Sequence, residues 1–407
     1  MSDNKSWPVM RELAGVKIVL GVCSSIAAYK AAYLVRELCA LGASVRVVMT
    51  QGAQAFIQPL TFQALSGEEV RCELLDTQAE RAMGHIELAR WADYLVIAPA
   101  SANFIAKMAH GIGDDLLSTL YLASMAPVIV CPAMNQNMWA HPATIANCTL
   151  LRERGVFFCG PDAGSQACGD TGFGRMVEPE TIVATLRLYP VHTLLRGCDV
   201  VITAGPTYEA IDPVRYIGNH SSGKMGYALA QAAQVAGATV TLISGPCALP
   251  IPWGVRYIGV TSAQEMLAAV KAQLKPGIIF IGAAAVADYY VEAPAKEKLK
   301  RHAQDNMNLV LQKNPDIVAE VVAYQEAAMV IGFAAETHDV LAHATEKFHA
   351  KQLDMLIANQ VGNGLGFAND KNQVTILTAS QQISLPLAPK MTLAGQIIIL
   401  IAQNIPH

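Results

Sequence analysis

Short apolar runs alternate with longer segments of helical periodicity along most of the chain. In the first half the apolar runs are residues 16–22, 44–50, 94–100 and 127–133. An amphipathic stretch over 26–40 and a longer one from Ala102 lie between them. Short continuous apolar runs are typical of strands that are buried on both faces. The alternation therefore predicts a parallel sheet covered by helices.

A segment rich in Gly, Asp and Pro, residues 160–176, interrupts this alternation, and a helix is expected to end near Pro190. The alternation then restarts, with strand and helix patterns over 198–207, 226–246, 278–288, 329–336 and 355–359. We therefore predict an α/β fold with two doubly wound, Rossmann-like domains of mainly parallel strands. The expected domains are residues 1–190 and 191–407.

Composition narrows the class of protein. The 407 residues include 53% hydrophobic and 15% charged residues, yet no apolar run approaches the ~18–20 residues that a membrane span needs. The net charge of −4 argues against a nucleic-acid partner. Residues 1–15 carry no apolar signal-peptide core, so a cytoplasmic protein is expected. The nine cysteines form no C-x-x-C pair, which argues against a zinc site or a disulfide framework.

The loop GNHSSGKMG, residues 218–226, nearly matches the phosphate-binding loop of P-loop enzymes. Met225 stands where that loop has a magnesium-binding Ser or Thr, so a metal ion would arrive mainly with a nucleotide. The loop joins a strand to a helix, which is where open α/β sheets bind ligands. Gly223, Gly226 and Lys224 suit a phosphate site. The alternative to a phosphate site is a flexible turn that caps a helix.

Two turns in the first half have a similar arrangement. Ser24 and Ser25 follow the first strand, and Ser101 and Asn103 follow the strand over 94–100. Neither turn is G-x-G-x-x-G, so a mononucleotide phosphate such as that of FMN fits better than a dinucleotide. This also disfavours a nicotinamide-dependent oxidoreductase. Ordinary helix N-caps are the alternative for each turn.

Three side chains in the first half are candidates for proton transfer. His85 stands alone in its segment, and a lone His is more often structural than catalytic. Asn135 follows a strand, where its amide could bind a substrate carboxylate or amide. Cys168 lies in a polar, glycine-rich segment that has the composition of a flexible lid. These residues alone do not identify the reaction.

The motifs together carry a specific resemblance. SIAAYK, PASANFIAKMAHGIGDDLLS, PAMNQNMW and ACGDTGFGRM resemble the flavin-containing cysteine decarboxylases. ITAGPTYEAIDPVRYIGNHSSGKMG, GAAAVADY, KNPDIV and GFAAET resemble the phosphopantothenate–cysteine ligases. In this order on one chain, the motifs resemble the bacterial bifunctional coenzyme A biosynthesis proteins over residues 15–400.

For residues 191–407, the resemblance implies ligation of 4′-phosphopantothenate to cysteine through an acyl-cytidylate, with CTP as co-substrate and Mg²⁺ or Mn²⁺. It implies that Lys298 neutralises charge on the triphosphate and that Asn219 acts on the acyl-nucleotide. The implied CTP-binding residues are Gly205, Ser221, Gly223, Gly226, Gly282, Ala283, Ala284, Asp288, Asn314, Pro315, Asp316, Ile317, Phe333, Lys347 and Lys351.

For residues 1–190, the resemblance implies FMN-dependent decarboxylation of 4′-phospho-N-pantothenoylcysteine to 4′-phosphopantetheine, in a homo-oligomer. His85, Asn135 and Cys168 would be catalytic. The implied FMN-binding residues are Ser24, Ser25, Ile26, Thr50, Ser101, Ala102 and Asn103. Ser24 departs from the family pattern, which usually has glycine there. A peptidyl-cysteine decarboxylase and a non-enzymatic flavin-binding regulatory subunit are the alternatives; the ligase motifs argue against the first and the three catalytic candidates against the second.

Overall fold

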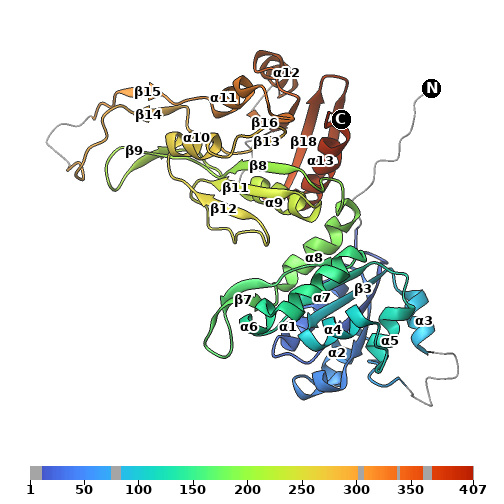
Figure 1. The fold of residues 1–407 in the computed structure, drawn as a ribbon. Coiled ribbons are helices and arrows are strands. Elements are labelled where there is room, and N and C mark those ends of the chain that lie inside the picture. The colour runs from blue at the N-terminus through green and yellow to red at the C-terminus, as the bar shows by residue number, and fades with distance from the viewer. Residues whose placement is uncertain (1–11, 75–83, 301–306, 337–339, 361–368, 407) are drawn as a thin grey trace, which may run out of the picture. The chain divides into compact units, whose positions relative to one another are not determined.

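The computed structural model describes residues 12–74, 84–300, 307–336, 340–360 and 369–406. The chain divides into two compact units, one over Arg11–Arg187 and one that begins at Leu188 (Figure 1). The boundary expected near Pro190 lies in the short helix η3 (Tyr189–Val191), at the start of the second unit. Residues 1–11, on which the expectation about a signal peptide rests, lie outside the described residues.

Five parallel strands form the main sheet of the first unit, in the order β2-β1-β3-β4-β5. Their bounds are β1 Lys17–Val22, β2 Ser44–Met49, β3 Tyr94–Ala100, β4 Val128–Pro132 and β5 Phe157–Phe158. Because β1 pairs with both β2 and β3, the strand order reverses at β1. Every residue of β3 is buried, which explains its uninterrupted apolar sequence.

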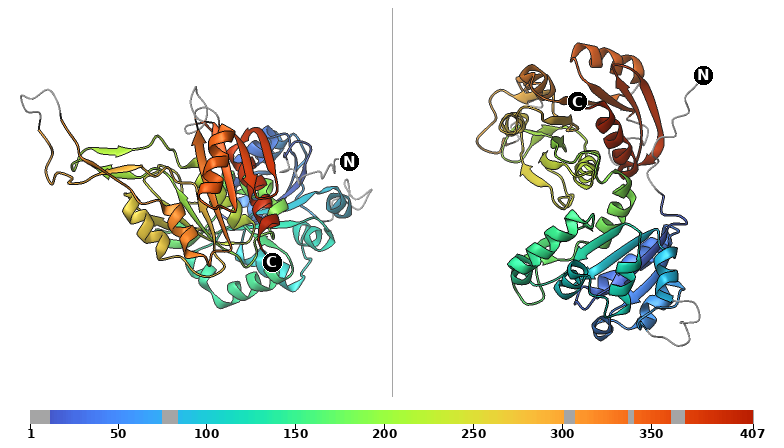
Figure 2. Two further views of the ribbon diagram at one scale, coloured as in Figure 1. Left: turned by 90° about the horizontal axis from the view of Figure 1, so that it is seen from above. Right: turned by 45° about the vertical axis from the view of Figure 1, so that its right-hand side comes forward.

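Helices lie on both sides of this sheet (Figures 1 and 2). They are α1 Ala28–Ala40, α2 Pro59–Ser66, α3 Gly84–Trp91, α4 Ala102–His110, α5 Leu116–Ala123, α6 Gln136–Ala140, α7 Pro142–Glu153 and α8 Pro179–Leu188, with the 3-10 helix η1 Gln51–Ala55. The helical stretch expected from Ala102 is two helices. Gly111 takes a positive φ of 68° and ends α4, and the Asp115 carboxylate accepts from the Ser118 N–H at 2.8 Å to cap α5.

The Gly-rich segment 160–176 contains an antiparallel hairpin, β6 Asp162–Ser165 and β7 Thr171–Arg175. Its composition gave no strand signal, because glycines and polar residues interrupt the apolar alternation by which strands are recognised. Cys168 lies in the turn of this hairpin.

Eight strands form the main sheet of the second unit, in the order β12-β11-β8-β13-β16-β17-β18-β19. Their bounds are β8 Asp199–Ala204, β11 Thr239–Ser244, β12 Arg256–Gly259, β13 Ile279–Gly282, β16 Met329–Glu336, β17 Met355–Gln360, β18 Lys371–Thr378 and β19 Gln382–Pro389. The strands from β12 to β17 pair in parallel, whereas β18 and β19 are antiparallel. The predicted α/β class, with two Rossmann-like units of mainly parallel strands, is confirmed.

The helices of the second unit are α9 Lys224–Val235, α10 Ala263–Lys271, α11 Ile317–Tyr324, α12 Val340–Ala350 and α13 Lys390–Asn404. Two short antiparallel ribbons, β9 Tyr208–Ala210 with β10 Tyr216–Gly218 and β14 Tyr289–Val291 with β15 Leu311–Lys313, extend away from the main sheet (Figure 2). The strand–helix alternation did not predict these ribbons or the β18–β19 hairpin.

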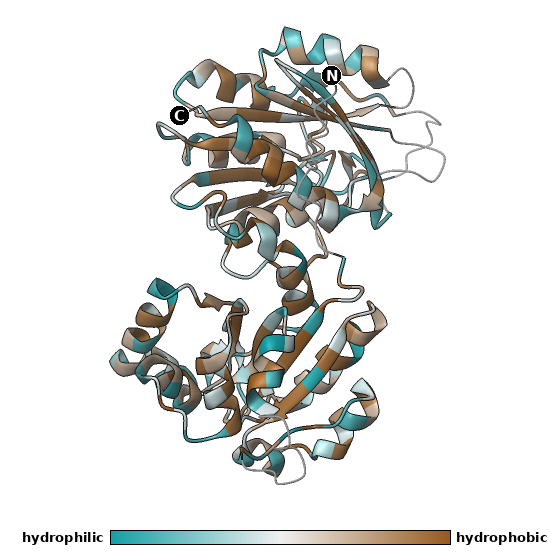
Figure 3. Ribbon diagram, turned by 90° about the vertical axis from the view of Figure 1, so that its right-hand side faces the viewer, coloured by the Kyte–Doolittle hydropathy of each residue, from teal (hydrophilic) through white to brown (hydrophobic). Residues whose placement is uncertain are grey.

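Hydrophobic residues fill the space between sheet and helices in each unit. In Figure 3 they dominate the strands, whereas hydrophilic residues lie mostly on the outer helices and loops. Residues 397–402 are an apolar run that lies in α13, where Ile397, Ile398 and Ile401 are fully buried. None of the helices in the described ranges has the length and apolarity that a membrane crossing requires.

Candidate functional site

The carboxyl ends of three neighbouring strands of the first unit bring the predicted FMN residues to one edge of the sheet. Ser24 and Ser25 follow β1, Thr50 follows β2, and Ser101 follows β3. The Thr50 N–H donates to Val22 O at 3.0 Å, and the Cys23 N–H donates to Pro99 O at 3.1 Å. The three turns are therefore joined by backbone hydrogen bonds. This is the edge, beside the reversal in strand order, where doubly wound sheets bind ligands.

The hydroxyl groups at this edge also organise the adjoining helices. The Ala27 N–H donates to Ser25 Oγ at 3.2 Å, and the Phe104 N–H donates to Ser101 Oγ at 3.3 Å as the N-cap of α4. Each oxygen accepts one bond, and its own O–H can still donate to an anion. The capping alternative and the phosphate-binding interpretation are thus compatible.

Side chains at the same edge differ in access to solvent. Ile26 and Asn103 are exposed, and Ser101 and Ala102 are half-buried. Cys23, by contrast, is fully buried, and burial raises the pKa of its thiol to about 12. Cys23 therefore stays protonated near neutral pH and is a structural cysteine.

The structure brings together two of the three candidates for proton transfer. Asn135 Nδ2 donates to Asp170 Oδ2 at 3.1 Å and to Cys168 Sγ at 3.4 Å. The Cys168 thiol in turn donates to Asp170 Oδ2 at 3.5 Å. Cys168 is exposed, whereas Asn135 and Asp170 are half-buried. An amide, a thiol and a carboxylate therefore form one hydrogen-bonded cluster, of which sequence reasoning missed Asp170.

Hydrogen bonds hold the β6–β7 hairpin against the segment that carries Asn135. The Met134 N–H donates to Gly174 O at 2.9 Å, and the Gln136 N–H donates to Gln166 Oε1 at 3.1 Å. Gly174 has a φ of 142°, and a Cβ at this position would clash with Met134 O. Glycine is therefore required for the close approach that places Cys168 beside Asn135.

His85 is not part of this cluster. It is the second residue of α3 and is half-buried. No hydrogen bond joins it to Asn135, Cys168 or Asp170 among the described atoms.

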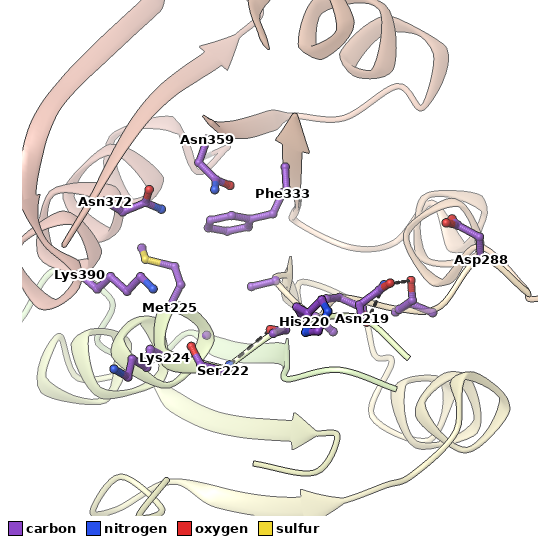
Figure 4. Close-up of a pocket in the computed structure, with 18 residues that line it drawn as sticks. Asn219, His220, Ser222, Lys224, Met225, Asp288, Phe333, Asn359, Asn372 and Lys390 are labelled. Carbon is purple, nitrogen blue, oxygen red and sulfur yellow. Dashed lines mark hydrogen bonds between the residues drawn. The ribbon is translucent and has the colours of Figure 1, made fainter. Parts of the chain in front are cut away.

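The GNHSSGKMG loop lines a cavity of about 550 Å³ in the second unit (Figure 4). This volume is in the range of small-molecule sites, about 300–1,000 Å³. Of the residues predicted for the ligase site, those that line it are Asn219, Ser221, Gly223, Gly226, Ala283, Ala284, Asp288 and Phe333. They come from the loop before α9 and its first turn, from the segment after β13, and from β16, so separate parts of the chain again meet at one edge of the sheet.

Glycines shape the loop for different reasons. Gly223 has a φ of 72° and precedes α9, and its N–H donates to Ser221 Oγ at 3.3 Å. A Cβ on Gly226 would lie 2.5 Å from Ala204 Cβ, so this glycine allows α9 to pack on β8. Gly205 has a φ of 73°, and a Cβ at this position would lie 2.7 Å from Cys247 Sγ, so a larger residue would not fit.

Asn219 is held by the segment that follows β13. Its Nδ2 donates to Val286 O at 3.0 Å and to Ala285 O at 3.3 Å. The side-chain amide therefore spans from the loop to the segment after β13, at the end of the cavity where Figure 4 shows Asp288.

Several predicted residues lie away from this cavity. Lys298 is exposed, and Asp316 pairs with Lys351 at 2.7 Å and caps α11. Burial would raise the pKa of Asp316, but the hydrogen bonds from Lys351 and the Ala319 N–H lower it below its usual range. The residues predicted for CTP that do not line the cavity are Gly205, Gly282, Asn314, Pro315, Asp316, Ile317, Lys347 and Lys351.

Asn314 has a distinct environment. Its Nδ2 donates to Ala287 O at 2.8 Å, whereas its Oδ1 is buried and accepts no hydrogen bond within the described structure. A buried acceptor of this kind suits a ligand that brings an N–H donor, such as an amino group on a base.

Three polar residues that sequence reasoning missed also line the cavity. Lys390 begins α13, Asn359 lies in β17 and Asn372 in β18, and all three are at most 9% exposed. Burial lowers the pKa of Lys390, the charge of Lys224 lowers it further, and Asp370 acts in the opposite direction. A polar residue near the end of an apolar run is a usable signal for Asn359. The predicted alternation of strands and helices ended at residue 359, so it did not include the other two.

The second unit has another cavity, of about 380 Å³, at the opposite edge of its sheet. Its lining includes Asp199, Thr239 and Arg256, the first residues of β8, β11 and β12. Within the described ranges, no group of three or more His, Cys, Asp or Glu side chains is placed to hold a metal ion.

Comparison with known proteins gives matches over both units. The family model "Flavoprotein" matches residues 7–188, and "DNA/pantothenate metabolism flavoprotein C-terminal domain" matches residues 195–405. The coenzyme A biosynthesis bifunctional protein CoaBC of Vibrio vulnificus (strain CMCP6) is 53% identical over 392 residues, covering 96% of this chain and 98% of that protein. The protein of the same name from Escherichia coli (strain K12) is 51% identical over 393 residues, covering 95% and 96%. A solved C-terminal domain of CoaBC is 38% identical, covering 52% of this chain and 97% of that one, with a TM-score of 0.44.

Proposed function

The chain belongs to the family of coenzyme A biosynthesis bifunctional proteins, and from this premise we propose how its two units divide the chemistry. It is an enzyme with ligase and decarboxylase activities, as the motifs predicted. We assign the CTP-dependent ligation of 4′-phosphopantothenate to cysteine to residues 191–407. We assign the FMN-dependent decarboxylation of the product to residues 1–190. The observation that carries the proposal is identity of about one half over nearly the full length of both chains.

The ligation needs an activated carboxylate, because forming an amide from a carboxylate and an amine is uphill in water. The substrate carboxylate oxygen would attack the α-phosphorus of CTP, and pyrophosphate would leave with the bonding electrons. The amine of cysteine would then displace CMP from the acyl-cytidylate. The N-terminus of α9, with the Gly223 turn before it, supplies backbone N–H groups for phosphates at the cavity wall. We assign the acyl-nucleotide step to Asn219, whose Nδ2 donates to Val286 O and which lines the same cavity.

The first-unit edge fits FMN by its donor set. The hydroxyl groups of Ser25, Thr50 and Ser101 lie on three adjacent turns, and that of Thr50 donates to Val22 O at 3.5 Å. Glycine at position 52 leaves room for Ser24, because a Cβ there would lie 2.8 Å from Ser24 Oγ. When bound, FMN would supply reversible hydride chemistry at the carbon that bears the substrate thiol, so the reaction has no net redox change.

This chain's own residues would bind the substrate and move a proton. The Asn135 amide would bind the substrate carboxylate or amide, and its bond to Asp170 fixes its orientation. The Cys168 thiol, exposed at the hairpin turn, would donate a proton to the carbon that loses CO₂. We assign His85 an auxiliary role in the steps before CO₂ loss.

The proposal also covers the oligomeric state of the protein and its location in the cell. Ile26, Tyr29 and Tyr33 lie on and next to α1 and are 53–62% exposed. This apolar face supports a homo-oligomer, because monomeric proteins rarely expose contiguous apolar patches. We place the protein in the cytoplasm, with Mg²⁺ or Mn²⁺ brought mainly by CTP.

The direct test is a product assay on the purified protein. With 4′-phosphopantothenate, cysteine, Mg²⁺ and CTP, we expect 4′-phosphopantetheine, CO₂, CMP and pyrophosphate, identified by mass. ATP in place of CTP tests the nucleotide preference, and heat release of the flavin should give FMN. Absence of the condensation product, or bound FAD, would contradict the assignment.

Replacing Cys168 by Ser tests the proton donor. A serine hydroxyl is a much weaker acid than a thiol, so the final protonation should fail while flavin binding and CO₂ loss continue. We expect a decarboxylated product lighter than 4′-phosphopantetheine by two hydrogens, measured by mass spectrometry. Cys198→Ser, in the second unit, serves as the control. Unchanged 4′-phosphopantetheine formation by Cys168→Ser would remove Cys168 from the mechanism.

Variants of the second unit separate its two steps. Lys298→Gln should slow pyrophosphate release by about 10²–10³, because a neutral amide cannot offset charge on the leaving group. Asn219→Asp cannot donate to Ala285 O and Val286 O and adds a negative charge beside the acyl-nucleotide, so amide formation should be slowed most. The measurements are pyrophosphate release and amide formation, with the exposed neighbour Lys296→Gln as control.

Decarboxylation of supplied 4′-phospho-N-pantothenoylcysteine should be unchanged in these variants, because units with their own cores keep largely separate chemistry. Pyrophosphate release at the parent rate by Lys298→Gln would show that the first step is wrongly assigned.

A further inference from the structure

Lys224, the lysine of the GNHSSGKMG loop, forms an ion pair away from the centre of the cavity. Lys224 Nζ pairs with Asp370 Oδ1 at 2.6 Å, and Figure 4 shows its side chain directed away from Phe333 and Met225. Asp370 is highly exposed, so this ion pair faces solvent. In a P-loop, the lysine at this position reaches the β- and γ-phosphates. The sequence resemblance to a P-loop therefore does not extend to the position of this ammonium group.

A different lysine occupies the interior. Lys390 is 7% exposed, and in Figure 4 its side chain extends into the cavity toward Met225. The β18–β19 hairpin leads the chain to this point, and α13, which Lys390 begins, packs against α9. The ammonium group thereby lies on the same cavity wall as the α9 N-terminus.

Two buried amides accompany Lys390. Asn359 and Asn372, at 9% and 7% exposure, line the same end of the cavity, while Asp288 and Asn219 lie at the far end (Figure 4). Side-chain amides and an ammonium group provide hydrogen-bond donors in several directions. Donors gathered beside a helix N-terminus are the usual environment of a phosphate group.

The local charges favour an anionic ligand at this end. Burial and the nearby charge of Lys224 both disfavour the protonated form of Lys390, and they lower its pKa despite Asp370. A phosphate beside Lys390 would offset both effects, since an opposite charge within a few ångströms stabilises the ammonium form. The carboxylate that lines the cavity, Asp288, lies at the opposite end and is exposed.

We propose that Lys390, with Asn359 and Asn372, forms the subsite for the terminal phosphates of the nucleoside triphosphate, in place of Lys224. This inference rests on the proposed ligase function and adds residues to it. When the substrate carboxylate attacks the α-phosphorus, the bond from that phosphorus to the bridging oxygen breaks. The departing pyrophosphate keeps the electron pair and stays hydrogen-bonded to Lys390 until it is released. No proton transfer is needed in this step.

The test compares matched variants by calorimetric binding of CTP, pyrophosphate and CMP in the presence of Mg²⁺. Lys390→Gln should weaken CTP and pyrophosphate binding by about 10- to 100-fold, the loss expected for a charge-assisted hydrogen bond. CMP, which lacks the terminal phosphates, should bind almost as it does to the parent. Lys224→Gln should weaken CTP by less than about threefold, as expected of an exposed ion pair. Lys390→Arg should recover most of the affinity.

A measurement on the parent protein avoids dependence on the folding of any variant. Acetylation of lysines, followed by peptide mass spectrometry, should show protection of Lys390 by pyrophosphate and little change at Lys224. Equal binding of CTP and pyrophosphate by folded Lys390→Gln, or protection of Lys224 alone, would overturn the subsite. If that occurs in a protein that still makes the amide with CTP, the ligase function stands and only the subsite is wrong. A parent protein that binds neither CTP nor pyrophosphate would overturn the function itself.

Discussion

Parallel pairing of the strands is the constraint on which both sites depend. The main-sheet strands of the first unit, and the strands from β12 to β17 in the second, run in one direction, so the turns that follow them emerge at the same edge of each sheet. Val22 O accepts from the Thr50 N–H at 3.0 Å, which ties the turn after β2 to the end of β1. In the second unit, Gly282 aligns with Thr203 on one side and Gly332 on the other. Residues far apart in sequence therefore come together in the fold, although no local sequence pattern indicates which of them will be neighbours.

Antiparallel elements then complete each site with side chains that the parallel sheet cannot supply. The β6–β7 hairpin carries Cys168 to Asn135, and the missing Cβ of Gly174 allows the close approach. The β18–β19 hairpin carries the chain to Lys390 at the start of α13. In both units a hairpin that the strand–helix alternation did not predict delivers a residue to which we assign chemistry.

Most of the fold could be predicted because buried parallel strands have uninterrupted apolar sequences. β3 and β8 were recognisable in this way. The β6–β7 hairpin was not, because its strands contain Gly and polar residues and bury little of their surface. The turns that carry Ser25, Ser101 and Gly223 were predicted from their position between strand and helix. Lys390 and Asp170 were not, because their roles depend on tertiary contacts with α9 and Asn135 that no local pattern encodes.

The central claim is that nucleotide binds at the carboxyl edge of the second unit's sheet, and hydrogen exchange with and without CTP and Mg²⁺ tests it most directly. CTP should slow amide exchange in peptides that cover 219–226 and 283–288, which line the 550 Å³ cavity. Peptides with Thr239 and Arg256, at the 380 Å³ cavity on the opposite edge, should exchange as in the free protein. Protection confined to that opposite edge, with none over 219–226, would contradict the account.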